Sequence, residues 1–469
     1  MRKFLNMTHK YSFLILFFAA AIKPITLNFT NFDLFGDEAQ YLLWSQNLDL
    51  GYYSKPPLLA WILSGYTFFF GDGFVSIKLF PFFFYFFTSY VIYLLAIEIF
   101  KKNEIAVISA ITFYLMPAVS VSSFLISTDV VLVFFWSLLL LFVLKIRKQK
   151  KIINFLILGI LLGLALLTKY AAAYFVLSLI ILFFFDNKTK EVFKKNIFSF
   201  FVFVFSALVV VMPNIIWNIN NGWVTLVHTS ENAGLSRMGF NILQGIEFVF
   251  VQGLMIGPLI FFVFLFNIKK LSLNFETKFL LCFSLPIFFI VFVESVLVRA
   301  NANWAAVALV PLFLLIVNHV YIYSKKILVL SNFLNFVFCI VFFILIGLTK
   351  PFGIFDRING LTSFANFIDN KYLVKQKNLV VQDRLLFANI KYLFRKNDIV
   401  ILTPYDAGGV IKSHFQLSDP LPAVFKESFI YIGNIEGVYY VANINNFKLV
   451  EKKAVSFKAK PLKIYEVNF

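Results

Sequence analysis

Long apolar runs separated by short polar segments make up most of this sequence. Runs of about 17 to 25 apolar residues are long enough to cross the hydrocarbon core of a bilayer as helices. The runs predict spans near residues 11–29, 74–100, 104–125, 129–146, 152–168, 170–185, 197–213, 248–267, 279–298, 304–323 and 327–349, eleven in all. The pattern therefore predicts a polytopic α-helical membrane protein.

The polar segments between the runs indicate how the helices are oriented. Lys and Arg gather in every second segment, beginning with the amino terminus. Because such segments face the cytoplasm in membrane proteins, we expect a cytoplasmic amino terminus. The first loop at 30–73, the loop at 214–247 and the chain after Lys350 then lie outside.

Composition agrees with this class and excludes others. Hydrophobic residues make up 60% of the chain and charged residues 14%, more apolar surface than one soluble core buries. The net charge of +18 lies in short clusters between apolar runs, so it indicates membrane orientation and not nucleic-acid binding.

Residues 351–469 have a different pattern, with more charge and short apolar or alternating runs. Runs of this kind are typical of strands, and they predict strands at 378–381, 398–402, 428–432 and 437–441, with a helix near 382–395. We therefore expect a membrane domain at 1–350, including the first loop, and a small periplasmic α/β domain at 351–469. The latter has no phosphate loop or dinucleotide motif, which favours a supporting or acceptor-binding role.

Two adjacent carboxylates, Asp37 and Glu38, directly follow the first predicted span. Acids at a membrane boundary are costly to desolvate, which favours a reaction centre. The alternative is that Asp37 caps a helix over residues 38–48, but a cap explains only one of the two acids.

Other polar residues fall at the same predicted boundary. Asp129 begins a span and is also a good helix cap, whereas Lys169 lies in an outer hairpin, from which it would otherwise extend to lipid headgroups. Together with Asp37 and Lys55, they come from four separate segments of the chain. We expect the four to converge in one site.

Two further outer segments carry an unusual number of polar side chains. The loop from Trp217 to Arg237 contains His228 and is rich in Trp, Asn and charged residues. Carbohydrate and phosphate sites often have this composition. Interfacial anchoring is the alternative for the Trp residues. Residues 299–304 start a span with one Arg and two Asn, more than a helix start needs.

These motifs together resemble the bacterial GT-C superfamily of glycosyltransferases. Its members include protein O-mannosyltransferases and the aminoarabinose transferase that modifies lipid A, in glycosyltransferase families 39 and 83. The resemblance covers most of residues 30–320 and rests on Gly36–Tyr41, Lys55-Pro56-Pro57, Phe70–Gly73, Ser127–Asp129, Leu167–Tyr170 and Asn303–Ala306.

The resemblance implies an inner-membrane enzyme that transfers a sugar from a polyprenyl-phosphate donor on the periplasmic face. The acceptor would be lipid A, another glycolipid, a polysaccharide or a protein. It implies that Asp37 and Asp129 are the catalytic acids and that Lys55 and Lys169 bind the donor phosphate. In-line displacement predicts inversion at the anomeric carbon, with a carboxylate on the acceptor side and cations on the leaving side.

The full set of predicted site residues follows from these two lines of reasoning. The catalytic candidates are Asp37, Glu38 and Asp129; the donor-phosphate candidates are Lys55, Lys169, Arg237 and Arg299; the substrate-binding candidates are Tyr53, His228, Asn303 and Trp304. We expect a monomer that does not bind nucleic acid.

A metal site is not favoured. In the aminoarabinose transferases an acid precedes the Lys-Pro-Pro element and helps to bind metal, and here that position is Ser54. Glu38 and His228 remain as candidate ligands, and no other cofactor is predicted.

The competing hypothesis is a transporter or flippase of lipid-linked sugars. The sequence shows no internal repeat, and its charged residues gather at one face, which favours the transferase.

Overall fold

The computed structural model describes residues 21–234, 238–348, 353–374, 376–405, 411–422, 424–435 and 446–469. The chain forms two compact units. The first comprises Met1–Thr26, Lys55–Leu59 and Val75–Ile344, and the second comprises Leu27–Ser54, Ala60–Phe74 and Leu345–Phe469. Most of the first loop thus belongs to the same unit as the carboxy-terminal residues, a grouping that separation along the sequence does not reveal.

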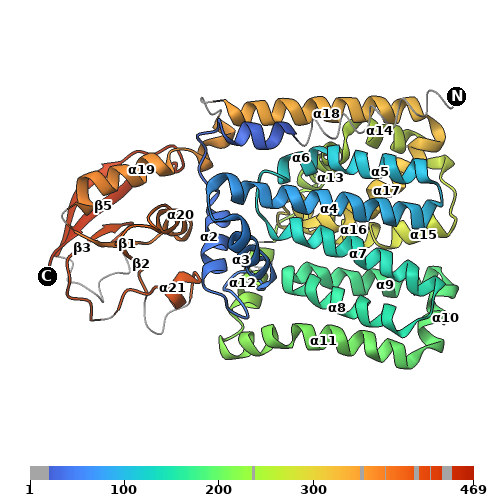
Figure 1. Cartoon of the computed structure of the whole chain (residues 1–469), viewed down its shortest axis with the longest axis horizontal. Coiled ribbons are helices and arrows are strands. Elements are labelled where there is room, and N and C mark those ends of the chain that lie inside the picture. Colours follow the sequence, from blue (N-terminus) through green and yellow to red (C-terminus); the bar gives the residue numbers. More distant parts are fainter. Residues whose placement is uncertain are drawn as a thin grey trace. The chain divides into compact units, whose positions relative to one another are not determined.

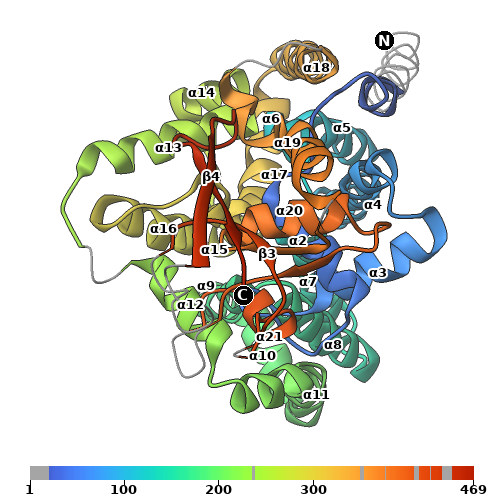
Figure 2. The same ribbon diagram turned by 90° about the vertical axis from the view of Figure 1, so that its left-hand side faces the viewer.

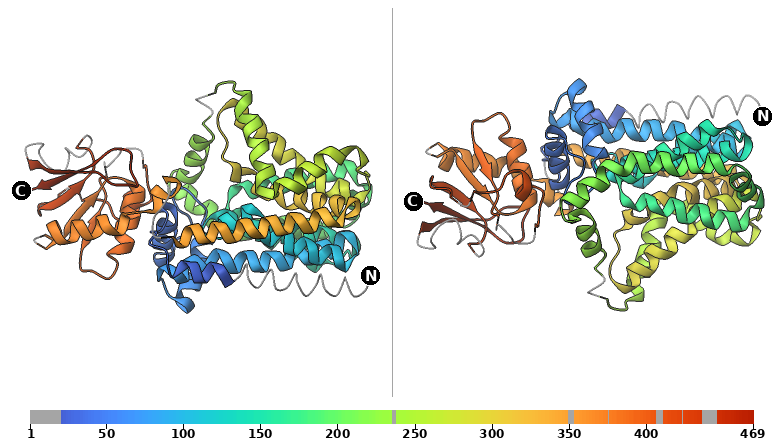
Figure 3. Two further views of the ribbon diagram at one scale, coloured as in Figure 1. Left: turned by 90° about the horizontal axis from the view of Figure 1, so that it is seen from above. Right: turned by 90° about the horizontal axis from the view of Figure 1, so that it is seen from below.

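The first unit is helical, and its long helices run side by side (Figure 1), as the two views of Figure 3 also show. Its elements are α4 (Phe74–Phe100), α5 (Asn103–Leu115), α6 (Pro117–Ser122), α7 (Thr128–Lys148), α8 (Ile152–Thr168), η1 (Tyr170–Ala173), α9 (Tyr174–Phe185), α10 (Asn187–Lys195), α11 (Ile197–Asn220), α12 (Val224–Ala233), α13 (Ile242–Ile256), α14 (Pro258–Asn267), η3 (Ile268–Lys270), α15 (Phe275–Cys282), α16 (Leu285–Leu297), η4 (Ala302–Ala305), α17 (Ala306–Tyr323) and α18 (Lys325–Gly347).

Among the described residues, six helices are long and apolar enough to cross a membrane, or up to eight if each of two bent pairs is one span. The chain is therefore a multi-pass membrane protein, and the expected count of eleven stays a prediction. Some of the predicted spans are interrupted, two of them directly before a proline. The run at 248–267 bends by 114° between α13 and α14, where Gly257 adopts a φ of +124° and Pro258 cannot donate to the preceding turn. The run at 104–125 breaks before Pro117, because a residue that precedes proline avoids the helical region.

Burial separates central from peripheral helices in this unit. The apolar windows of α7 and α17 are each 72% buried, whereas those of α11 and α18 are 33% and 28% buried. Figure 2, which looks along the helices, shows α18 and α11 at the margin of the bundle. The exposed faces of α11 and α18 are apolar, as expected for helices that contact lipid.

Two glycines allow α8 and α11 to pack closely. A Cβ added to Gly159 would clash with the Ser206 hydroxyl and the Phe203 carbonyl oxygen, and one added to Gly163 would lie 2.6 Å from Val210 Cβ. Because residues four apart share one face of a helix, the pair forms the small-residue contact that membrane helices use to approach each other.

The second unit contains a five-stranded sheet with helices around it. Its elements are α2 (Gly36–Gln46), α3 (Leu58–Phe70, whose first two residues belong to the first unit), η5 (Gly353–Ile358), α19 (Leu361–Ile368), η6 (Asp369–Leu373), β1 (Asn378–Val381), α20 (Arg384–Leu393), β2 (Val400–Leu402), α21 (Phe415–Ser418), β3 (Phe429–Ile432), β4 (Phe447–Lys453) and β5 (Leu462–Val467). The strand order is β2-β1-β3-β5-β4. β1 is parallel to β2 and β3, and β5 is antiparallel to β3 and β4.

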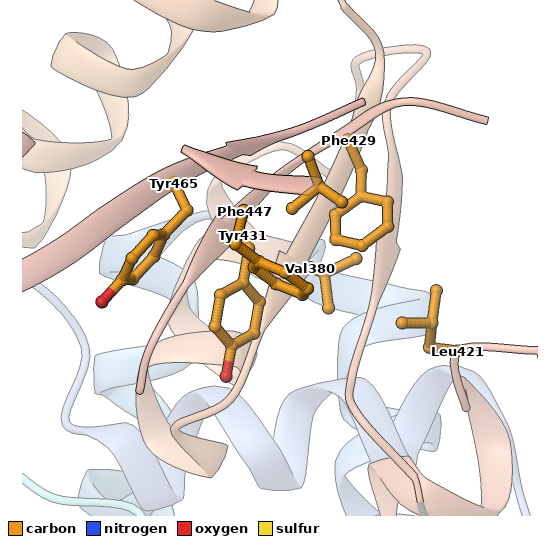
Figure 4. Close-up of a cluster of buried hydrophobic side chains, with 7 residues drawn as sticks. Val380, Leu421, Phe429, Tyr431, Phe447 and Tyr465 are labelled. Atoms are coloured by element: carbon orange, nitrogen blue, oxygen red, sulfur yellow. The ribbon is translucent and has the colours of Figure 1, made fainter. Parts of the chain in front are cut away.

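β1, β2, β3 and α20 occupy ranges in which the sequence predicts strands and a helix. The predicted strand at 437–441 lies outside the described residues. β4, β5 and α19 were not predicted. Buried side chains on one face of the sheet pack into a cluster, shown in Figure 4, that includes Val380, Phe429, Tyr431, Phe447 and Tyr465.

Candidate functional site

Three chain segments of the first unit meet at the carboxylate of Asp129. Lys169 Nζ donates to Asp129 Oδ1 at 2.7 Å, and Asn303 Nδ2 donates to Asp129 Oδ2 at 2.7 Å. The side chains of Asp129 and Lys169 are only 11% and 19% exposed. The expectation that Asp129 and Lys169 lie together is confirmed, and Asn303 joins them.

Local structure explains how each of these side chains reaches the site. Ser127 is the N-cap of α7, so Asp129 lies in the first helical turn and is not itself the cap. Lys169 occupies the extended residue between α8 and η1, and Asn303 lies in η4, the short turn before α17. All three therefore come from the ends of helices at one end of the bundle.

A cavity of about 500 Å³ opens beside Asp129. Its lining is mainly apolar, from residues such as Met116, Leu125 and Leu309, and Asp129 and Asn303 are among its few polar side chains. A second cavity of about 280 Å³ is polar, lined by residues that include Gln244, Glu247 and Arg299. The cavities share Val251 and Ala302, so they adjoin. An apolar cavity with a charged group at its wall suits an amphiphilic ligand.

The opposite end of α7 is basic. Lys148 pairs with Glu98 at 2.5 Å, and Arg147 pairs with Asp186 at 2.9 Å. A 21-residue helix at 1.5 Å per residue separates the two ends by roughly 30 Å, the thickness of a bilayer core. The acidic site and the Lys-rich segments thus lie at opposite ends of the helices.

Two lysines near the site were not anticipated from the sequence. Lys23 Nζ donates to Ser123 Oγ at 3.0 Å, and Lys78 Nζ donates to the carbonyl oxygen of Phe124 at 3.2 Å. Both lysines are buried, and they hold the segment that leads into α7. Their presence inside apolar runs was the available signal, because a cation at membrane depth needs a specific partner.

The paired acids of the first loop have different environments in the second unit. Phe35 is the N-cap of α2, so the alternative interpretation, in which Asp37 caps this helix, is wrong. Glu38 is fully buried, and its Oε2 accepts a hydrogen bond from Phe35 N at 2.9 Å. The Asp37 side chain is 42% exposed. Glu38 thus stabilises the start of the helix, while Asp37 remains accessible.

Arg384, the first residue of α20, is the charged neighbour of Asp37. Its Nη2 lies 3.9 Å from Asp37 Oδ1. The two helices approach closely because residue 36 is a glycine, and a Cβ there would lie 2.6 Å from Leu385 Cβ. Sequence reasoning missed Arg384, since nothing local relates it to Asp37.

The remaining predicted site residues are spread over both units. Tyr53 is buried, and Lys55, His228 and Trp304 are partly buried. Arg237 lies outside the described residues. Asp37 and Tyr53 belong to the second unit, whereas Lys55, Asp129, Lys169, His228, Arg299, Asn303 and Trp304 belong to the first. The expected convergence of Asp37 with the other clusters therefore stays a prediction.

No group of three or more His, Cys, Asp or Glu side chains that could hold a metal ion occurs within the described ranges. Ser54, at the position of the expected acid, is buried and offers only a hydroxyl. The two candidate ligands, Glu38 and His228, belong to different units.

Comparison with known proteins finds a matching family and two similar transferases. Residues 54–217 match the family described as dolichyl-phosphate-mannose-protein mannosyltransferase. The chain is 29% identical to the lipid A galacturonosyltransferase RgtD of Rhizobium johnstonii, over 95% of each chain. It is 32% identical to the undecaprenyl phosphate-alpha-4-amino-4-deoxy-L-arabinose arabinosyl transferase of Wigglesworthia glossinidia brevipalpis, over 34% of this chain and 31% of that one.

Solved structures share the fold at low sequence identity. ArnT from Cupriavidus metallidurans in the apo state superposes with a TM-score of 0.67 at 11% identity, covering 98% of both chains. The same protein bound to undecaprenyl phosphate gives a TM-score of 0.66 at 12% identity, over 97% of this chain and 98% of that one. The oligosaccharyltransferase of Archaeoglobus fulgidus gives 0.50 at 14% identity, over 81% of this chain and 61% of that one. Together, the family match, the relatives and the shared fold support a glycosyltransferase that resembles the GT-C superfamily.

Proposed function

We propose that this enzyme transfers a sugar from a polyprenyl-phosphate carrier to lipid A at the periplasmic face of the bacterial inner membrane. The observation that carries the proposal is the Asp129 carboxylate, held by Lys169 and Asn303 at the wall of a mainly apolar cavity. Two relatives named for lipid A and for an undecaprenyl-phosphate-linked sugar support both substrates.

The placement of charge supports the proposed orientation. Asp129 lies at one end of α7 and the basic residues Arg147 and Lys148 at the other. Since basic segments stay in the cytoplasm, the Asp129 end would face the periplasm. The amino terminus would then be cytoplasmic, and the carboxy-terminal residues would be periplasmic.

The carrier would occupy the two adjoining cavities of the first unit. Polyprenyl is a hydrocarbon, so the apolar cavity of about 500 Å³ suits the part of the chain next to the phosphate. Arg299, in the wall of the polar cavity, is exposed and offers charge to the phosphate. Lys169 is already paired with Asp129, so we assign it to orienting that carboxylate, and its predicted contact with phosphate becomes secondary.

The reaction is a single displacement at the anomeric carbon. An acceptor hydroxyl of lipid A attacks this carbon, its proton passes to the Asp37 carboxylate, and the bond from the carbon to the phosphate oxygen breaks. The polyprenyl phosphate leaves with the bonding electrons, and inversion follows from attack opposite the leaving group. Asp37 suits the role of base because its side chain is the accessible member of the acidic pair.

A deletion strain complemented with variants tests this proposal. Mass spectrometry of lipid A should show a sugar increment with the wild-type chain, no increment with Asp37→Asn, and the full increment with Asp49→Asn. Asp49 is a matched control because it is an acid of the same loop, and its Oδ1 accepts a local hydrogen bond from Leu50 N at 2.7 Å.

Binding distinguishes a transferase from a transporter or flippase. Purified Asp37→Asn should bind undecaprenyl phosphate as tightly as the wild type while transferring no sugar. Unchanged lipid A after gene deletion, or full transfer by Asp37→Asn, would refute the proposal.

A further inference from the structure

The guanidinium of Arg384 is held beside Asp37 without a hydrogen bond to it. The distance of 3.9 Å from Nη2 to Asp37 Oδ1 exceeds the 2.7 to 2.9 Å of a charged hydrogen bond. Within the described part of the chain, the Arg384 side chain makes no hydrogen bond, and this long ion pair is its one charged contact; the side chain is 28% exposed. Arginine carries five N–H donors in a planar fork, so most of its hydrogen-bonding capacity is available to a ligand.

The backbone that carries Arg384 is firmly fixed at its start. Asp383 caps α20 by accepting a hydrogen bond from Leu386 N at 2.9 Å, and Lys458 Nζ donates to Asp383 at 2.6 Å. On the other side, Leu385 packs against Gly36 of α2. The Arg384 side chain therefore starts from a defined point next to the first turn of α2.

The carboxy-terminal end of α20 is also held by hydrogen bonds to a first-loop residue of the second unit. Arg395 Nε donates to Asp72 Oδ2 at 2.6 Å, and Tyr392 Oη donates to the Asp72 carbonyl oxygen at 3.1 Å. Arg395 thus has a full structural role, and its guanidinium holds the pKa of Asp72 below its usual range. Arg384 differs, because its partly exposed guanidinium has no such hydrogen-bonded partner in the described residues.

We propose that Arg384 binds the carboxylate of the transferred sugar, so that the enzyme selects a uronosyl donor. This inference rests on the proposed function. An anionic sugar brought up to Asp37 would be repelled by that carboxylate, and a guanidinium beside it offsets the repulsion. A planar fork pairs with a carboxylate through two parallel hydrogen bonds, which a lysine cannot reproduce.

The identity of a relative supports this choice of anion. The similar lipid A galacturonosyltransferase is named for a sugar that bears a carboxylate. The carrier phosphate is the competing anion, but it is common to every polyprenyl-phosphate donor. A comparison of two donors that differ only in the sugar carboxylate therefore separates these possibilities.

The test measures kcat/KM for reconstituted full-length protein with undecaprenyl-phosphate galacturonose and undecaprenyl-phosphate galactose. The wild type should prefer the uronosyl donor. Arg384→Gln should lower the ratio of the two kcat/KM values by about 10- to 100-fold, the effect of losing hydrogen bonds to a charged group. Arg384→Lys should lower it by less. Arg395→Gln is the matched control and should leave the ratio unchanged.

The other possible outcomes contradict either this inference or the proposed function. An equal loss with both donors would assign Arg384 to the phosphate or to Asp37 and overturn the inference, as would an unchanged ratio or a wild type that prefers galactose. If Arg384→Gln fails to fold, the ratio for Arg384→Lys decides alone. A wild type that transfers neither sugar to lipid A refutes the proposed function itself.

Discussion

The ion pair between Asp129 and Lys169 can be tested by a double-mutant cycle. Its two charged atoms are 2.7 Å apart. At that separation, Coulomb's law gives about 1.5 kcal/mol in bulk water and about 6 kcal/mol at an effective dielectric constant of 20. Desolvation of both groups offsets much of this energy. For side chains that are 11% and 19% exposed, we expect a net coupling of about 2 to 3 kcal/mol.

The cycle compares the wild type with Lys169→Met, Asp129→Asn and the double variant, by reversible unfolding in mixed micelles. Lys169→Met should lower the free energy of unfolding by about 3 kcal/mol, because Asn303 is then the one partner that Asp129 keeps among the described residues. The double variant should be about as stable as either single variant, because the second substitution removes the partner of an ion pair that the first has already broken. None of the three should transfer sugar at the wild-type rate.

The chain supplies its own control for this measurement. Lys195 and Glu191 are also 2.7 Å apart but are 68% and 61% exposed. Solvent screens such a pair, so the same cycle there should give at most about 0.5 kcal/mol. Equal coupling at the two sites, or additive effects at Asp129 and Lys169, would show that burial does not strengthen this contact.

Two further predictions concern the second unit. Gly36→Ala should lower the free energy of unfolding by about 1 to 3 kcal/mol through its clash with Leu385, and Leu385→Ala should restore part of it. Gly65 lies inside α3, where an added Cβ has nothing within 4 Å, so Gly65→Ala should not destabilise the fold and should stabilise it slightly. Burial lowers the pKa of His414 from 6.5 to about 4, despite the nearby Asp49 and Asp419, which act to raise it. The unfolded chain then binds the proton more readily, so stability should fall as the pH drops from about 6.5 towards 4, by up to about 1.4 kcal/mol per unit. His414→Phe should flatten that part of the pH profile, and an unchanged slope would contradict this origin.

The length of the apolar runs predicted the helices, because each run is a long and local signal in the sequence. The predicted run at 152–168 coincides with α8, and that at 74–100 with α4. The interruptions at Gly257-Pro258 and before Pro117 were also encoded locally. They were missed because a window of about 20 residues averages over one breaking residue.

The site was predictable only where a charged residue stands out from its surroundings. Asp129 and Lys169 are ionisable groups at the ends of apolar helices, so topology alone brings them to one end of the bundle. The buried Asp33, by contrast, accepts hydrogen bonds from the backbone N–H groups of Leu361 and Thr362. Like the approach of Arg384 to Asp37, that contact joins segments far apart in the sequence and depends on tertiary packing, which periodicity does not encode.

Asp37 and Asp129 both lie at the start of a helix, but their side chains differ in exposure to solvent. Asp37 is the second residue of α2, and Asp129 is the second residue of α7. The partial positive charge of a helix N-terminus stabilises a carboxylate at such a position. Asp129 has both oxygens occupied and is largely buried, so it is suited to a fixed, orienting role. Asp37 is exposed, and its nearest cation stands too far away for a hydrogen bond. A base must accept a proton from a substrate that comes and goes. Among the described residues, Asp37, unlike Asp129, has no hydrogen-bond partner on its carboxylate, which favours Asp37 for the proposed role.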